Sequence, residues 1–169
     1  IINFAGFTNV DECERQPDKA FLINSVIPKN LAISSERTDC KLIHISTDHL
    51  YENSLGKNSE EDDVDLINQY AKSKFKGEEY IKENCDKFII LRTNFFCKGA
   101  VKKSFADWIR SNLEIEQELE LFDDVNFNPV HSKKVFKSIE QLVSKNMYGL
   151  FNLSSNEGDL SVTIPTRSL

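Results

Sequence analysis

Residues 41–48, KLIHISTD, form an apolar run that ends in small polar residues. The run has the composition of a buried β-strand, and its last residues mark the carboxyl end of that strand. In an open parallel sheet, ligands collect at the carboxyl ends of the strands. Thr47 and Asp48 stand at such an end, so we expect them at the edge of the sheet that carries the functional site.

Strand and helix signals alternate along the chain, which is the pattern of an α/β protein with a parallel sheet and covering helices. Short strands are expected at residues 1–4, 42–45, 88–91 and 149–153, with a further candidate at 119–122. Helices are expected from Pro17 to Ile33 with a kink at Pro28, around Tyr70, from Phe105 to Leu113, and from Val135 to Leu142.

Tyr70 and Lys74 stand four residues apart in NQYAKSK (residues 68–74), so one helical step sets a phenol and an ammonium on the same face. Catalytic proton transfer needs a pKa near the working pH, and a free tyrosine titrates too high. A close lysine charge would lower the pKa of the phenol, and Thr47 at the strand end could meet it. Two alternatives stay open: a solvated face for the Tyr70 helix, and a capping or turn role for Thr47 and Asp48.

The composition excludes several classes of function. The chain has 169 residues, 40% of them hydrophobic, and no segment approaches a membrane span. A net charge of −6 and a pI near 5.2, without a basic stripe, argue against a nucleic-acid partner. Four scattered cysteines without a C-x-x-C pair indicate free thiols in a reducing cytoplasm rather than zinc or disulfides. The acidic residues at 60–65 are expected as a solvated loop without a metal, and the three histidines carry no functional signal.

Three motifs taken together are similar to those of a known family. They are Ser46-Thr47-Asp48, the pattern Tyr70-x-x-Ser73-Lys74-x-x-Gly77-Glu78, and Leu91-Arg92-Thr93. They resemble the extended short-chain dehydrogenase/reductases, and among them most closely the dTDP-4-dehydrorhamnose reductases. The opening at residues 2–14 is similar to the family's strand-to-loop segment beside the cofactor, and Asn24 matches an asparagine of the helix that follows.

The resemblance implies a Rossmann-like parallel sheet that is incomplete at its amino-terminal side. Residues 1–99 would be a partial NAD(P)-binding domain, and residues 100–169 part of a small substrate-binding lobe with an atypical tail. The family's glycine-rich turn, G-x-G-x-x-G, does not occur in the sequence. We therefore expect an upstream unit to be missing, and we do not expect the chain alone to be a competent dehydrogenase.

The resemblance also implies roles for particular residues. Thr47, Tyr70 and Lys74 would be catalytic. Ala5, Gly6 and Phe7, together with Tyr70 and Lys74, would bind the cofactor, NADPH or NADH. Thr47, Asp48 and Phe95 would contact the substrate, with Phe95 in the place of an aromatic residue that is usually tryptophan. Taken alone, a phenylalanine such as Phe95 is more often a core residue than a pocket residue.

The implied reaction is reduction of a nucleotide-linked 4-keto sugar in carbohydrate biosynthesis. A sugar-nucleotide epimerase or dehydratase of the same superfamily is one alternative, because it would use the same tyrosine and lysine. A non-catalytic regulatory subunit, resembling that of methionine adenosyltransferase, is another. The expected setting is the cytoplasm, with a nucleotide-sugar substrate, no nucleic acid and no membrane, and a homodimer as one possible assembly.

Overall fold

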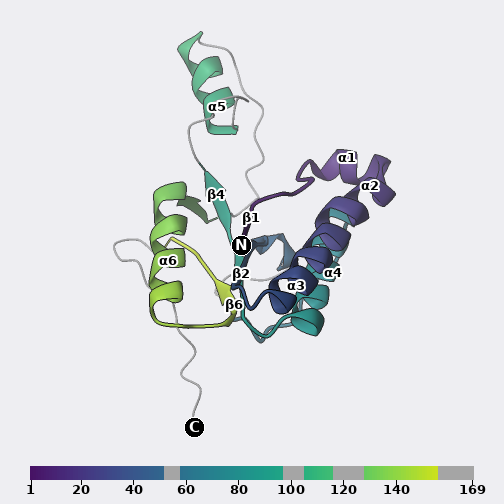
Figure 1. Cartoon of the computed structure of the whole chain (residues 1–169). Helices are drawn as coiled ribbons and strands as arrows, with labels where there is room; N and C mark the ends of the chain where they lie inside the picture. The colour runs from purple at the N-terminus through teal and green to yellow at the C-terminus, as the bar shows by residue number, and fades with distance from the viewer. Residues whose placement is uncertain (52–57, 97–104, 116–127, 156–169) are drawn as a thin grey trace.

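The computed structural model describes residues 1–51, 58–96, 105–115 and 128–155. Its centre is a four-stranded parallel sheet of order β1-β2-β3-β6 (Figure 1). The strands are β1 (Ile2–Asn3), β2 (Leu42–Ile45), β3 (Phe88–Arg92) and β6 (Gly149–Asn152). A second parallel pair joins β4 (Asn94–Phe96) and β5 (Pro129–His131).

Alternation of side chains along β2 and β3 divides the core into two layers. One set of strand residues packs against α6 (Ser132–Ser144), as the buried side chains Ile43, Ile45, Ile89, Leu91, Val135, Ile139 and Leu142 show. The other set faces α3 (Ile27–Arg37) and α4 (Gln69–Asn84), through Leu42, Ile90, Ala32 and Ile81. Helices therefore cover both faces of the sheet, as Figure 1 shows with α6 on one side and α3 and α4 on the other.

The segment before β2 is a nearly continuous helical run. It comprises α1 (Val10–Arg15), α2 (Pro17–Phe21), a π-helical turn (Leu22–Val26) and α3. Pro17 opens α2, as the sequence predicts, and Pro28 lies in the first turn of α3. The irregularity expected at Pro28 falls just before it, in the π-helical turn.

Helix α4 lies directly against the π-helical turn because Gly77 allows the two backbones to approach. A Cβ atom at Gly77 would stand 2.2 Å from the backbone oxygen of Asn24. At its beginning, α4 is capped by Asn68, whose side chain accepts a hydrogen bond of 2.8 Å from the amide of Ala71. This packing fixes the position of the helix that carries Tyr70 and Lys74.

The elements after residue 99 join the structure formed by the first half of the chain. Strand β6 pairs with β3, and α6 packs on the same sheet, whereas α5 (Phe105–Glu114) projects away from it (Figure 1). A division into domains at residue 99 stays a prediction, and the described elements on its two sides share one core. The expected strand at 119–122, Cys97 and the tail at 161–169 lie outside the described residues.

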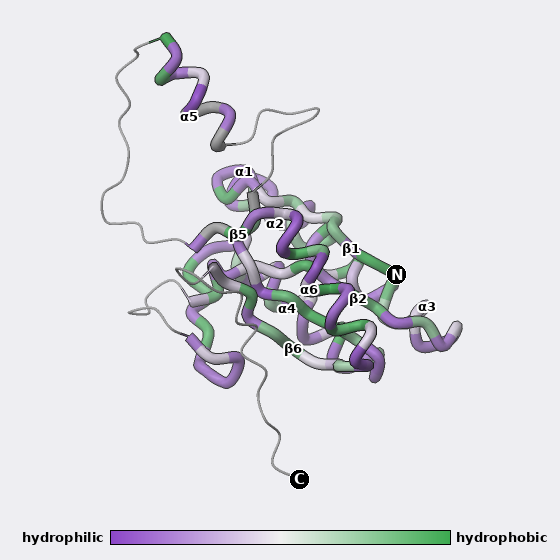
Figure 2. The backbone as a smooth tube through the Cα atoms, turned by 90° about the vertical axis from the view of Figure 1, so that its left-hand side faces the viewer, coloured by the Kyte–Doolittle hydropathy of each residue, from purple (hydrophilic) through white to green (hydrophobic). Residues whose placement is uncertain are grey.

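The expected α/β fold class is confirmed. In the described part of the chain Cys13, Cys40 and Cys85 are free thiols, and no group of histidine, cysteine, aspartate and glutamate has the geometry to hold a metal. No helix among the described residues has the length and apolar character needed to cross a membrane. Figure 2 shows an apolar stretch at β1, beside the amino terminus.

Candidate active site

Thr47 connects the end of β2 to a short 3₁₀ turn, Asp48–Leu50. Its side-chain oxygen accepts a hydrogen bond of 3.2 Å from the amide of His49, so Thr47 does cap this turn. The same hydroxyl lies close enough to the phenol of Tyr70 to lower its pKa. Because its oxygen already accepts from His49, its proton is available to the phenol. The capping interpretation and the expected meeting with Tyr70 therefore both hold.

Tyr70 lies in the first turn of α4 and is 8% exposed, which contradicts the alternative of a solvated helix face. Its ring packs with Cys13 and Ala20, and it makes a T-shaped contact with the His49 ring, with 5.8 Å between centroids. Burial raises the pKa of the phenol; the nearby Thr47 hydroxyl acts against this, and the charge of Asp48 adds to it.

Lys74 lies one turn further along α4, and its side chain is 3% exposed. The ammonium donates a 2.7 Å hydrogen bond to the backbone oxygen of Ile45, at the end of β2. Burial lowers the pKa of Lys74 to about 8, and the negative charge of Glu78 partly opposes that shift.

One expectation about the tyrosine and lysine pair is wrong for this structure. Lys74 was expected to lower the pKa of Tyr70, yet the pKa of Tyr70 is raised and the lysine charge is not among its causes. The reason is that burial desolvates the phenol, while the lysine nitrogen donates its hydrogen bond to the Ile45 carbonyl. A raised pKa keeps the phenol protonated at neutral pH, so Tyr70 is in its proton-donating form.

His44 carries no functional signal in the sequence, yet it lies next to Lys74 in the structure. Side chains alternate along β2, so His44 faces α4 and is fully buried there. Its Nε2 lies 3.4 Å from the Lys74 nitrogen, and its Nδ1 lies 2.9 Å from the side-chain nitrogen of Asn3 in β1. Burial, and then the charge of Lys74, hold the pKa of His44 well below 6.5. The position of His44 within an apolar strand does not reveal these contacts in the sequence.

The loop after β1, which contains Ala5, Gly6 and Phe7, is held by Asn24 of the π-helical turn. The side chain of Asn24 accepts from the Phe7 amide at 2.8 Å and donates to the Phe7 carbonyl at 2.9 Å. It also donates to the Ser73 hydroxyl on α4 at 3.0 Å. The loop is thereby fixed beside the helix of Tyr70 and Lys74, and Ala5 and Gly6 are exposed there.

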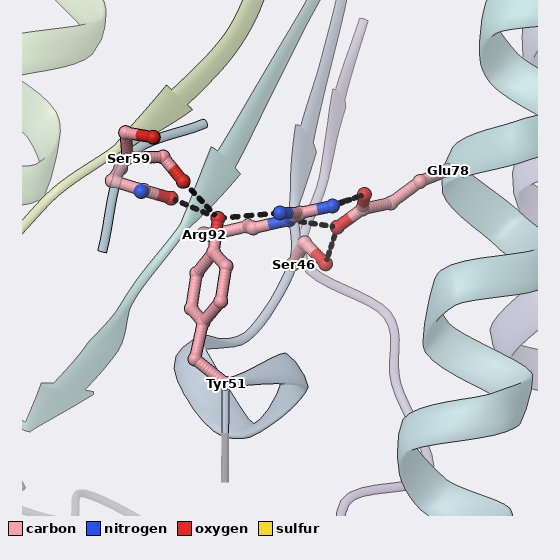
Figure 3. Close-up of polar contacts among 6 residues, drawn as sticks. Ser46, Tyr51, Ser59, Glu78 and Arg92 are labelled. Atoms are coloured by element: carbon pink, nitrogen blue, oxygen red, sulfur yellow. Dashed lines mark hydrogen bonds and ion pairs between the residues drawn. The ribbon is translucent and has the colours of Figure 1, made fainter. Parts of the chain in front are cut away.

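A buried polar network lies one turn further along the same face of α4, between this helix and the sheet (Figure 3). Glu78 and Arg92 form an ion pair of 2.7 Å with side chains 0% and 3% exposed, and Ser46 donates to the same carboxylate. Arg92 also donates to the hydroxyl of Tyr51. The network links the end of β2, helix α4 and the end of β3, where the three sequence motifs lie.

Of the expected substrate residues, Asp48 stands next to the Thr47 and Tyr70 pair, and its charge acts on the phenol. Phe95 lies on β4 and is 40% exposed. Its described ring contact is an edge-to-face arrangement with Phe4, with 6.2 Å between centroids. The structure thus brings together Thr47, Asp48, Tyr70 and Lys74, and it places Phe95 with the aromatic residues near β1.

A parallel sheet covered by helices on both faces, with its polar site at the strand ends, has the form of a Rossmann-type α/β protein. The family described as RmlD substrate binding domain matches residues 1–163, and the chain belongs to this family. The expected membership of the extended short-chain dehydrogenase/reductases is confirmed.

Named relatives agree with this assignment. The chain is 32% identical over 157 residues to the spore coat polysaccharide biosynthesis protein SpsK of Bacillus subtilis, covering 92% of this chain and 55% of that protein. It is 29% identical over 160 residues to the probable low-salt glycan biosynthesis reductase Agl14 of Haloferax volcanii, covering 92% and 53%.

A solved structure agrees as well. The dTDP-4-dehydrorhamnose reductase of Bacillus anthracis, in complex with NADP, superposes with a TM-score of 0.86 at 28% identity, covering 92% of this chain and 56% of that one. The chain therefore spans about half the length of the relatives that it matches.

Proposed function

We propose that this chain carries the catalytic side of an NAD(P)H-dependent reductase that acts on a nucleotide-linked 4-keto sugar. The observation that carries the proposal is the approach of the Thr47 hydroxyl to the Tyr70 phenol at the carboxyl end of β2, with Lys74 one turn further along the helix of Tyr70. The family membership supports it, as do the names of the relatives, which include a glycan biosynthesis reductase and a dTDP-4-dehydrorhamnose reductase.

In the proposed reaction, Tyr70 is the general acid. Reduction of the C4 carbonyl leaves a negative charge on its oxygen, and Tyr70 transfers the phenol proton to that oxygen, which gives the C4 alcohol. In this proposal Thr47 donates a hydrogen bond to the same oxygen and stabilises the charge as it develops. The raised pKa of Tyr70 keeps the phenol protonated at neutral pH, but it also makes the phenol a weaker acid than a free tyrosine, so the pKa shift itself does not favour this role.

The cofactor would be NADPH or NADH, which supplies the hydride. The residues present fit the nicotinamide side of such a cofactor. Lys74 offers a buried cation that can bond a ribose hydroxyl, and the loop of Ala5, Gly6 and Phe7 is held by Asn24 beside it, with two small exposed residues. The pyrophosphate would need a glycine-rich turn that this sequence lacks, so we expect the 169 residues alone to bind the dinucleotide weakly.

The substrate residues proposed here are Thr47, Asp48 and Phe95. Asp48 follows Thr47 directly and can accept hydrogen bonds from sugar hydroxyls. Phe95 is exposed on β4 and offers an apolar wall. As for setting, the free thiols of Cys13, Cys40 and Cys85 suit the cytoplasm, which we propose as the location.

The test is a steady-state assay of a protein that includes the expected upstream glycine-rich unit. With a dTDP-4-keto sugar and NADPH, we expect stoichiometric oxidation of the cofactor together with formation of the C4 alcohol. Conversion of the sugar without net consumption of NADPH would identify the epimerase or dehydratase alternative. No turnover of any nucleotide sugar, together with normal folding, would favour a regulatory subunit.

A further inference from the structure

Three buried side chains form a hydrogen-bonded line that ends at Lys74. The amide of Ala5 donates to Asn3 Oδ1 at 3.0 Å, and Asn3 Nδ2 lies 2.9 Å from His44 Nδ1. On the other side of the imidazole, His44 Nε2 lies 3.4 Å from the Lys74 nitrogen. Asn3, His44 and Lys74 are each at most 4% exposed, so water does not compete for these contacts.

The Ala5 amide fixes the direction of the hydrogen bonds along this line. Because Asn3 Oδ1 accepts from the Ala5 amide, the amide nitrogen of Asn3 faces His44 and donates to Nδ1. A neutral imidazole accepts at one nitrogen and donates at the other, so the proton of His44 must be on Nε2. The imidazole is neutral because burial and the Lys74 charge keep its pKa well below 6.5.

The Nε2–H of His44 therefore points at the nitrogen of Lys74. A lysine ammonium has three donors and no acceptor, whereas the neutral amine has a lone pair that can accept this N–H. Lys74 meanwhile donates to the Ile45 carbonyl in either form. His44 thus favours the neutral form of Lys74 and lowers its pKa, as burial does. The charge of Glu78, which lies one turn further along α4, raises that pKa.

We propose that Asn3 and His44 are a positioning pair that presents an N–H donor to Lys74 and so sets the pH at which this lysine loses its charge. The importance of this for catalysis rests on the proposed role of Lys74 beside the nicotinamide ribose. The pair itself is a property of the folded chain, and it can be tested without an activity assay.

The first experiment measures the tautomer of His44 in the unmodified protein by NMR correlation of its ring nitrogens and protons. With three histidines in the chain, His44 is identified as the signal that disappears in His44→Gln. We expect the Nε2–H tautomer, unchanged between about pH 5 and 8, where an ordinary histidine titrates. A proton on Nδ1, or an imidazolium in that range, would overturn the proposal.

The second experiment follows the titration of Lys74 through the NMR signal of its Cε–H group in Asn3→Asp. An aspartate at position 3 would accept from both Ala5 and His44 Nδ1, which moves the imidazole proton to Nδ1 and leaves Nε2 as an acceptor for the ammonium. We expect the Lys74 midpoint to rise by about one pH unit or more.

The matched control is Asn9→Asp. Asn9 is an exposed cap of α1, and aspartate is an equally good cap there, so the same charge is added without contact to His44. We expect no change in the Lys74 midpoint in this variant. An equal shift in both variants, or none in Asn3→Asp, would refute the role of the pair. If Asn3→Asp does not fold, the tautomer measured in the unmodified protein decides alone. If the NMR experiments give the expected results but the protein does not reduce a nucleotide sugar, the proposed function is wrong and the positioning pair still stands.

Discussion

The hydroxyl of Thr47 meets the phenol of Tyr70 and lowers its pKa, although 23 positions separate the two residues in the sequence (70 − 47). Thr47 is fixed by the 3₁₀ turn that it caps, and Tyr70 by the first turn of α4. Both backbones are therefore rigid where the two side chains meet. A pair held in this way can receive a carbonyl oxygen without first ordering a loop, which is what preorganised stabilisation of charge requires.

Replacement of Tyr70 by phenylalanine should remove the acid while it keeps the ring packed against Cys13 and Ala20. In a protein that includes the expected upstream unit, we expect turnover to fall by about two to four orders of magnitude, the usual contribution of general acid catalysis. Cofactor affinity should change little. Steady-state kinetics with a 4-keto sugar nucleotide measures both quantities.

Tyr80→Phe is the matched control, because Tyr80 lies on the same helix with its ring between Lys29 and Lys76. This variant should keep near-normal turnover. If Tyr70→Phe also turns over normally, another group donates the proton and the catalytic assignment fails.

The pKa of Lys74 predicts a pH dependence of stability. Burial lowers this pKa from 10.5 to about 8, so between these values the unfolded chain binds a proton at Lys74 that the folded chain has released. Stability due to this residue therefore rises with pH through the window from 8 to 10.5, and the full shift corresponds to about 3 kcal/mol.

The measurement is the free energy of unfolding, from chemical denaturation, of Lys74→Met and of the unmodified protein at about pH 7 and pH 10. Subtracting one protein from the other removes the contribution of the other lysines, because both proteins contain them. Between these two pH values the unmodified protein should gain stability that the variant does not gain. We therefore expect the free energy of unfolding of the variant, relative to the unmodified protein, to be lower at the higher pH by about 2 kcal/mol or more. A pH-independent difference would show that Lys74 titrates normally. Lys72→Met, at an exposed position of the same helix, should show no such change.

Removing one charge of the Glu78 and Arg92 ion pair should lower the stability of the fold strongly. Glu78→Gln leaves the guanidinium buried and 3% exposed without its counter-charge, so we expect a loss of about 3–5 kcal/mol in unfolding free energy. Glu12→Gln breaks an exposed pair with Arg15 and should cost less than about 1 kcal/mol. Equal effects in the two variants would show that burial does not set the energy of the internal pair.

Gly77→Ala should test the close approach of α4 to the π-helical turn. The added methyl would stand 2.2 Å from the backbone oxygen of Asn24, which cannot move as a flexible side chain would. We expect destabilisation of at least about 1–3 kcal/mol, seen as a lower midpoint of thermal unfolding. Gly6→Ala is the control, because its Cβ would find its nearest neighbour at 3.4 Å. A stable Gly77→Ala variant would mean that the two helices can separate at little cost.

Much of the fold follows from local sequence patterns. The apolar run at 42–45 is strand β2 with the bounds that the sequence predicts, and Val135, Ile139 and Leu142 are buried on α6 as their spacing indicates. The strands β4 and β5 were not predicted. Each has three residues and is defined by its pairing with the other, which no local pattern encodes.

The candidate site was predictable only in part, for the same reason. Thr47, Tyr70 and Lys74 are recognisable because their motifs are local. The contacts of His44 with Asn3 and Lys74 join residues 41 and 30 positions apart, so they depend on strand register and helix docking. The pKa of Tyr70 was predicted in the wrong direction because spacing along a helix shows neighbours but not burial.

The last prediction concerns the edge of the sheet at β1. Among the described residues this strand pairs with β2 alone, and about half of the surface of its residue Ile2 and of the adjacent Ile1 and Phe4 is exposed. The rings of Phe4 and Phe136 are in contact, with centroids 5.6 Å apart, and both are exposed, so the apolar surface continues onto α6. Unpaired strand groups beside exposed apolar side chains favour pairing with another chain. We expect the 169-residue chain to self-associate, with an average mass in sedimentation equilibrium that rises with concentration.

Ile2→Lys should reduce this association, because a charge on an edge strand opposes pairing between chains. Leu113→Lys is the matched control: Leu113 is 62% exposed on α5, which projects away from the sheet (Figure 1), and this variant should associate like the unmodified chain. A chain that stays monomeric at all concentrations would contradict the prediction. If both lysine variants reduce self-association equally, the added charge, and not the β1 edge, controls the association.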